Sequence, residues 1–322
     1  MSSISSQFRH SIHVCIFLLF ILSFEILAGG FNILPSQTNN ELIKDPRETY
    51  GLFLTIILYF IRLLSLLPLP LAVCHTCGLI IYNIFPDRPK LQNSPLLGPK
   101  IRIRVVTRGD YPDLVRNNVR RNLNTCSNVG LTNFQIEIVT DKPISLTGLP
   151  AGMVREVVVP SDYRTKSGAL YKSRALQYAL EPEVNQMALD DYIVHLDEET
   201  LLTENSVCGI LNFVNSNEFD IGQGLITYAN ETIVNHLTTL ADSMRVGVDL
   251  GCLRFCLKYF NRPPFLFKGS FVVCRASCEF EVTFDNGRAG SIAEDTYFAM
   301  AAMSKNKKFG WIEGNQISYA LD

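Results

Sequence analysis

Three consecutive acidic residues directly follow a short apolar run in this sequence. The run is residues 192–196, and Asp197, Glu198 and Glu199 come next. Mg²⁺ or Mn²⁺ prefers hard carboxylate oxygens and often bridges them to substrate phosphates. Alternate residues after a strand can aim two carboxylates at one ion, which makes Asp197 and Glu199 the candidate metal ligands. A solvated turn before a helix near Thr203 explains the same residues equally well.

Two further segments carry groups suited to a phosphate-bearing ligand. Asp141 directly follows the run 134–140. A carboxylate there can accept hydrogen bonds from a nucleotide base or ribose. The alternative is a turn, because Asp-Lys-Pro is an ordinary turn sequence. Cations suit a diphosphate and glycine allows close backbone approach, but an exposed basic helix start is the competing interpretation. The cations and the glycine are Lys166, Gly168, Lys172 and Arg174.

A third acidic pair, Glu294-Asp295, precedes an alanine-rich segment, residues 297–303. Acids in the first turn of a helix complement the helix dipole, and this structural explanation suffices for the pair alone. The functional alternative is a general base, in which a carboxylate beside a sugar hydroxyl takes the proton as the oxygen attacks.

Alternating and apolar patterns predict the elements that position these groups. The predicted strands are residues 101–107 (half-buried), 134–140, 154–159, 192–196, 221–228, 271–273 and 309–312. The predicted helices are 115–123 (capped by Asp113), 172–180, 203–213 and 297–303. This succession predicts an α/β fold with a mainly parallel sheet flanked by helices.

Ligands of such sheets gather beyond the carboxyl ends of the strands. The residues that directly follow three of the predicted strands therefore lie at one edge of the sheet, where a metal-bound, phosphate-bearing ligand fits. We call these residues the strand exits. These exits carry Arg108 and Asp110, then Asp141, then Asp197 with Glu198 and Glu199.

Two apolar segments near the N-terminus, at about residues 12–28 and 50–85, predict a membrane anchor within residues 1–98. A cleaved signal peptide is the alternative for the first segment, and the second would still anchor the chain. The second is longer than one helix needs, so it is either a span followed by a re-entrant piece or two short spans. The cations after Phe85 place that flank in the cytosol by the positive-inside rule.

Charge, cysteine usage and one sequon add to this placement. The formal net charge of −2 in 322 residues argues against nucleic acid as a partner. Nine scattered cysteines do not form a disulfide framework, which agrees with a reducing, cytosolic location. Asn230-Glu231-Thr232 is a glycosylation sequon, and we expect it to be unmodified because it faces the cytosol.

The order of these motifs resembles the inverting family-two glycosyltransferases of the GT-A fold. More narrowly, the chain is similar to the Egghead β-1,4-mannosyltransferases of animals over nearly its whole length. The motifs that carry the resemblance are residues 105–110, Lys166-Ser-Gly-Ala-Leu, residues 194–206, residues 222–230, Lys268-Gly269-Ser270 and Ala293-Glu294-Asp295.

The resemblance implies transfer of mannose from GDP-mannose to the glucose of glucosylceramide, in a metal-dependent, inverting reaction of glycosphingolipid synthesis at the endoplasmic reticulum or Golgi membrane. By this analogy Asp197 and Glu199 hold Mg²⁺ or Mn²⁺, and Asp295 is the base. The other implied roles are donor binding by Thr107, Arg108, Asp141 and Lys166, and acceptor contacts by Gly269, Ser270 and Glu294.

The chain departs from the family pattern at its C-terminal end. The family continues into a Gln-x-x-Arg-Trp motif that closes over the site, whereas this sequence ends at Asp322 and contains only Trp311. We therefore expect residues 99–322 to form a catalytic domain that is incomplete at its C-terminal end. The alternative is a truncated, non-catalytic membrane protein that binds a sugar nucleotide.

Overall fold

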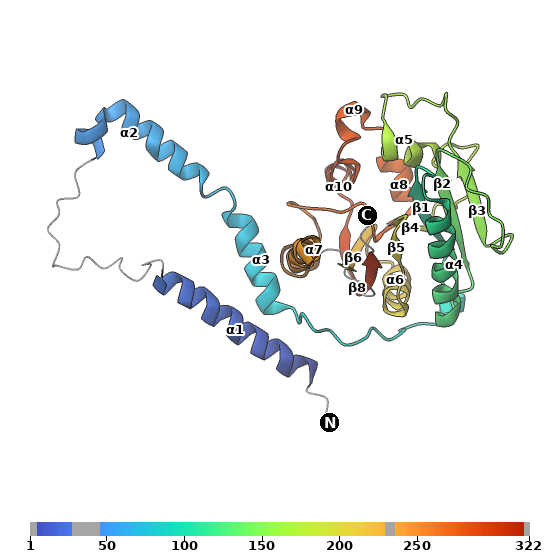
Figure 1. Ribbon diagram of the computed structural model, residues 1–322, viewed down its shortest axis with the longest axis horizontal. Helices are drawn as coiled ribbons and strands as arrows, with labels where there is room; N and C mark the ends of the chain where they lie inside the picture. The colour runs from blue at the N-terminus through green and yellow to red at the C-terminus, as the bar shows by residue number, and fades with distance from the viewer. Residues whose placement is uncertain (1–4, 28–45, 229–235, 319–322) are drawn as a thin grey trace. The chain divides into compact units, whose positions relative to one another are not determined.

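The computed structural model describes residues 5–27, 46–228 and 236–318 (Figure 1). The chain forms two compact units, residues 1–87 and 88–322. The structure does not test whether the anchor ends functionally at residue 98, which stays a prediction.

The N-terminal unit consists of apolar helices. They are α1 (Ser6–Leu27), α2 (Pro46–Leu64) and α3 (Leu69–Ile81). In the described residues, α1 and the combined segment Pro46–Ile81 are long and apolar enough to cross a membrane. Most of their large apolar side chains are exposed, among them Phe20 and Phe53. Helices with this composition and surface indicate membrane association.

The second unit is built on an eight-stranded mixed sheet with strand order β3-β2-β1-β4-β7-β6-β8-β5. β1 runs parallel to its neighbours β2 and β4. β3 runs parallel to β2, and β8 runs parallel to β6. β7 is antiparallel to both of its neighbours, β4 and β6. The strands are β1 (Ile101–Thr107), β2 (Phe134–Thr140), β3 (Val154–Val158), β4 (Tyr192–Asp197), β5 (Thr200–Leu201), β6 (Ile221–Tyr228), β7 (Val272–Arg275) and β8 (Phe309–Ser318).

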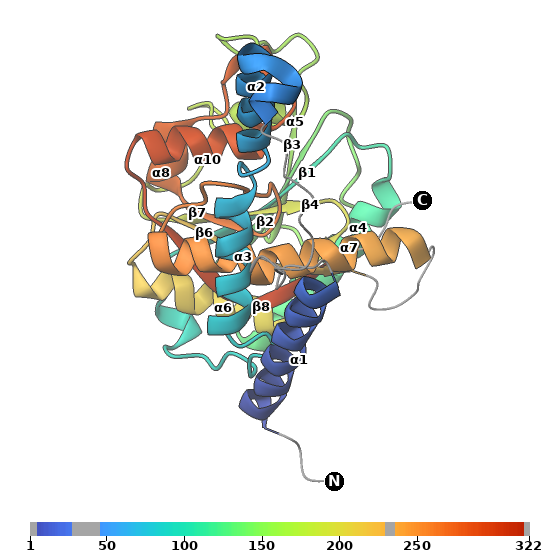
Figure 2. The same cartoon turned by 90° about the vertical axis from the view of Figure 1, so that its left-hand side faces the viewer.

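Helices cover both faces of this sheet, and Figures 1 and 2 show α6 on the side opposite α8 and α10. One core packs α4 and α6 against side chains such as Ile103, a second packs α5, α8 and α10 around Phe298, and a smaller third lies around Val139. The helices are α4 (Pro112–Val129), α5 (Tyr171–Tyr178), α6 (Glu204–Ser216), α7 (His236–Val248), α8 (Ala276–Val282), α9 (Gly287–Gly290) and α10 (Glu294–Ser304), with shorter turns at Pro95–Leu97, Asp249–Leu253 and Cys256–Phe260.

The predicted α/β fold with a mostly parallel sheet is confirmed, with two local corrections. The predicted start of α4, a cap at Asp113, is wrong. The helix begins at Pro112 after the N-cap residue Tyr111, and Asp113 lies in the first turn without capping it. β1 is buried at every residue except the partly buried Val106, rather than half-buried, because Arg102 and Arg104 lie in the core among charged partners.

Candidate active site

The strand exits predicted to meet do meet, at the carboxyl edge of β2, β1 and β4. These strands are adjacent and parallel, so their last residues leave the sheet on the same side. A cavity of about 370 Å³ opens there. Its lining includes Thr107, Arg108, Asp141, Lys172, Asp197 and Glu199. Five of the six predicted donor-side and metal-binding residues thus share this cavity with Lys172.

Asp197 lies at the end of β4 and is held from both its backbone and its side chain. Its backbone N–H donates to Ser270 Oγ at 3.1 Å, and Ser270 Oγ also lies 3.1 Å from Thr200 Oγ1. The Lys172 ammonium donates to Asp197 Oδ1 at 2.5 Å. Ser270, predicted on the acceptor side, therefore positions the strand end that carries Asp197.

Glu199 lies in the same cavity with an altered acidity. Burial, together with the negative charges of Asp197 and Glu198, raises the pKa of Glu199 to about 7. The Thr107 hydroxyl donates to Glu198, which draws this neighbouring carboxylate toward β1. Negative charge at Glu199 is thus poorly compensated by protein groups, as is typical of a cation-binding carboxylate.

The remaining donor-side residues divide into two groups. Asp141 lines the cavity, where Arg174 donates to it at 2.5 Å, and Arg108 lines the cavity as well. Lys166 is exposed and does not line this cavity, so its donor-binding role stays a prediction. Asp110 is turned toward Lys142 and forms an exposed ion pair with it at 2.5 Å.

A second, smaller pocket contains Gly269 and Glu294 of the predicted acceptor side, together with the predicted base Asp295, whereas Ser270 does not line it. Its lining includes Lys172, His195, Lys268, Gly269, Glu294 and Asp295. A Cβ added at Gly269 would lie 3.1 Å from Lys172 Nζ and 3.5 Å from Glu294 Oε1, so a side chain there would crowd the pocket. Burial raises the pKa of Glu294 despite the nearby Lys172 charge. Glu294 and Asp295, at the start of α10, therefore face this pocket together.

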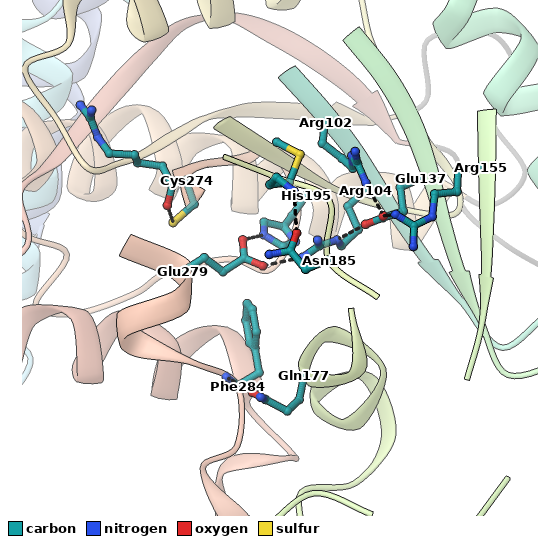
Figure 3. Close-up of polar contacts among 12 residues, drawn as sticks. Arg102, Arg104, Glu137, Arg155, Gln177, Asn185, His195, Cys274, Glu279 and Phe284 are labelled. Carbon is teal, nitrogen blue, oxygen red and sulfur yellow. Dashed lines mark hydrogen bonds and ion pairs between the residues drawn. The ribbon is translucent and has the colours of Figure 1, made fainter. Parts of the chain in front are cut away.

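A buried network of charged residues ends at His195, which lines the smaller pocket (Figure 3). Glu137 on β2 accepts from Arg102 at 2.7 Å and from Arg104 at 2.8 Å. Arg104 also donates to Glu279 at 2.5 Å, and Glu279 lies 2.8 Å from His195 Nε2. Because His195 lines the second pocket, two residues before Asp197, the network joins the sheet interior to the site.

Three residues of this arrangement were missed as site residues from the sequence. Lys172 was noticed only as one cation in a basic run and Arg104 only as a cation flanking the apolar segment, while Glu279 was not singled out. An arginine at every second position of an otherwise apolar strand was the available signal. Such arginines in a central strand require buried acidic partners.

The residues at the strand edge suit a divalent cation held jointly with a substrate. Among the described residues, no group of three or more histidine, cysteine or carboxylate side chains is arranged to hold a metal ion. Asp197 and Glu199 are a pair, and Mg²⁺ is commonly bound by one or two carboxylates plus substrate phosphates. The donor set and the raised pKa of Glu199 fit such an ion.

Known protein families include one whose model matches the part of the chain that contains the site. Residues 192–320 match the family model described as glycosyl transferase family group 2. This segment contains Asp197, Glu199, Glu294 and Asp295. The chain is therefore a glycosyltransferase.

Curated relatives narrow the assignment. The chain is 53% identical over 310 residues to the β-1,4-mannosyltransferase egh of Drosophila melanogaster, and 47% identical over 308 residues to bre-3 of Caenorhabditis elegans. In both cases the match covers 96% of this chain and 67% of the relative. The chain belongs to the β-1,4-mannosyltransferase family, and it is a mannosyltransferase.

Solved structures give more distant matches. S. aureus TarS, residues 1–349, aligns with a TM-score of 0.42 at 12% identity, covering 68% of this chain and 60% of TarS. Its complex with UDP-GlcNAc aligns with a TM-score of 0.41 at 13% identity, covering 69% of this chain and 59% of TarS.

Proposed function

We propose that the chain transfers mannose from GDP-mannose to the glucose of glucosylceramide, in glycosphingolipid synthesis. The product linkage is β-1,4, formed with inversion of the donor's α configuration. Support for mannose transfer comes from the mannosyltransferase relatives. The choice of GDP-mannose and of glucosylceramide rests on the family resemblance.

The observation that carries the proposal is the pair of adjoining pockets that share Lys172. Asp197 and Glu199 line the larger pocket, and Glu294 and Asp295 line the smaller. A donor in the first and an acceptor hydroxyl in the second would meet where the two adjoin. Such positioning is the main requirement of a single displacement between two bound substrates.

In this mechanism Asp295 takes the proton of the acceptor hydroxyl while the oxygen attacks the anomeric carbon of the donor sugar, and the bond from that carbon to the diphosphate oxygen breaks to release GDP. A positioned carboxylate base of this kind accelerates such reactions by about 10²–10⁴-fold. Gly269 and Glu294 contact the acceptor, and Ser270 holds the strand end carrying Asp197. Thr107, Arg108, Asp141 and Lys166 bind the nucleotide and its phosphates.

Asp197 and Glu199 hold Mg²⁺ or Mn²⁺ in this proposal. When bound, such an ion supplies charge that stabilises the leaving diphosphate. The supporting observations are the shared cavity of the two carboxylates and the raised pKa of Glu199.

We propose that the protein works at the endoplasmic reticulum or Golgi membrane with its catalytic unit in the cytosol. The apolar helices support membrane attachment. Cations after the second apolar segment support the cytosolic side. Of these, Arg88 and Lys90 are exposed, whereas Arg102 and Arg104 are buried in β1 and contribute only to the sequence pattern.

The direct test is a transfer assay with the full chain in detergent, using labelled GDP-mannose and glucosylceramide. We expect a mannosylated glycolipid, no transfer from UDP-glucose, and loss of product in EDTA that Mn²⁺ restores. Transfer that persists in EDTA would remove the metal from the mechanism. GDP binding without any transfer would instead support a non-catalytic sugar-nucleotide-binding protein.

The metal ligands are tested by Asp197→Asn, which should weaken Mn²⁺-dependent GDP binding by about ten-fold or more. Calorimetric titration with GDP, with and without Mn²⁺, measures this loss. Unchanged binding would place the metal elsewhere.

A further inference from the structure

Lys172 stands where the two pockets adjoin and lines both of them. It lies in the first turn of α5, directly after Tyr171, whose φ of 52° is uncommon for a non-glycine residue. Such a backbone persists where its surroundings enforce it, and these positions cluster at ligand sites. The start of α5 is therefore held in an unusual conformation beside the proposed site.

Three acceptors surround the Lys172 ammonium. Asp197 Oδ1 lies at 2.5 Å, the Gly269 carbonyl oxygen at 3.5 Å and Glu294 Oε1 at 3.6 Å. The two carboxylates that flank the side chain, Asp197 and Glu294, both favour a charged ammonium. The side chain is therefore a cation at neutral pH, placed between a donor-side carboxylate and an acceptor-side carboxylate.

This placement sets Lys172 in competition with a metal ion. The Asp197 oxygen nearest Lys172 belongs to the carboxylate that the proposed function assigns to Mg²⁺ or Mn²⁺. An ammonium and a divalent cation repel each other strongly at such short range in a partly buried site. Glu294 offers the ammonium a second carboxylate close by, and a donor diphosphate would offer further negative charge.

We propose that Lys172 is the counter-ion that Asp197 exchanges for the metal, and that the released ammonium then binds Glu294 and the donor's diphosphate. This inference rests on the proposed metal site. This exchange makes metal and nucleotide binding cooperative. The metal releases the Lys172 ammonium to bind the diphosphate, and the diphosphate draws the ammonium away from Asp197, which frees that carboxylate for the metal. By thermodynamic linkage, the effect of one ligand on the affinity of the other is reciprocal.

The experiment measures Mn²⁺ binding to the full chain in detergent by electron paramagnetic resonance, with and without GDP. Lys172→Met should bind Mn²⁺ alone about ten-fold more tightly than wild type, because the competing cation is gone. In saturating Mn²⁺, the same variant should bind GDP about ten-fold more weakly, because the diphosphate has lost a cation. Lys172→Arg should retain most of the cooperativity, since it keeps the charge.

Lys307→Met is the matched control. Lys307 pairs with Glu281, and neither residue lines the two pockets, so this variant should bind both ligands as wild type does. Tighter Mn²⁺ binding cannot arise from a damaged fold, which separates the proposed role from a merely structural one.

Two outcomes would overturn the inference in distinguishable ways. If wild type binds Mn²⁺ and Lys172→Met binds it equally or more weakly, Lys172 is not the exchanged counter-ion while the metal site stands. If wild type binds no Mn²⁺ even with GDP, the metal assignment of the proposed function fails and the inference fails with it.

Discussion

The acidic residues of the site differ in what surrounds them. Asp197 is paired with Lys172, Asp141 is paired with Arg174, and Glu199 has a pKa raised to about 7. Asp295 Oδ1 accepts from the backbone N–H of Thr296 at 2.7 Å, a local contact at the start of α10. The groups around a carboxylate set its pKa, and the pKa decides whether the carboxylate holds a ligand or moves a proton.

Asp295→Asn tests the base at this scale. We expect kcat for mannose transfer to fall by about 10²-fold or more, because an amide cannot take the hydroxyl proton. GDP-mannose binding should stay close to wild type, because Asp295 lines the smaller pocket and not the donor cavity. Radiolabelled transfer measures the first quantity and calorimetry the second. Undiminished kcat would exclude Asp295 as the base.

At the scale of elements, charged side chains join β1, β2, β4 and α8 inside the sheet. Arg102 and Arg104 are essentially inaccessible to solvent and share Glu137, while Arg104 also reaches Glu279. Buried ions of this kind are tolerated only when they are paired, and removing one partner leaves an uncompensated charge. The network therefore constrains which elements can pack together beneath the site.

Glu137→Gln should destabilise the catalytic unit by about 3–5 kcal/mol at pH 7, since both arginines lose their shared carboxylate. Urea denaturation of the detergent-solubilised chain measures the free energy of unfolding. Glu281→Gln, which alters a more exposed ion pair with Lys307, is the control and should change it little. Equal effects of the two substitutions would contradict a special role for the buried network.

The same network predicts the direction of the pH dependence. Burial would raise the pKa of Glu137 and Glu279, but Arg104 and the other nearby cations outweigh it and lower both pKa values below the usual 4.5. A lowered folded-state pKa means that these carboxylates stabilise the fold at neutral pH. That stabilisation is lost as the pH falls below about 4.5 toward the folded-state values. The wild-type and Glu137→Gln denaturation curves should therefore converge at low pH.

At the scale of the whole molecule, a catalytic unit follows a unit of apolar helices. The proposed glycolipid acceptor resides in a membrane, which agrees with an enzyme that carries apolar helices long enough to cross one. Asn230-Glu231-Thr232 tests the side of the membrane on which the catalytic unit lies, although this sequon falls outside the described residues.

We expect no glycan at Asn230, because a cytosolic segment never meets the lumenal glycosylation machinery. The measurement is the electrophoretic mobility of the expressed chain before and after deglycosylation, with Asn230→Gln as the matched variant. A mobility shift in wild type that Asn230→Gln abolishes would place the catalytic unit in the lumen.

Much of the fold was predictable from local pattern. The strands β1, β2 and β6 have the predicted bounds, because alternating or continuous apolar runs depend on burial near the backbone alone. The start of α6 was close to prediction, because Thr203 and Ser206 form a capping box within four consecutive residues. Parallel strand order then placed Asp141 and Asp197 at one edge.

The sequence by itself thus determined most of the strands, the common edge for their acidic exits, and the apolar helices that indicate a membrane, whereas β5 was not predicted. Only the tertiary structure decided that Lys172, rather than Lys166, lines both pockets, and that Arg102 and Arg104 are buried. The physical reason is range: Lys172 meets Asp197 across 25 residues, and Arg104 meets Glu279 across 175. Which long side chain meets which partner depends on how distant elements pack, and no local spacing encodes that.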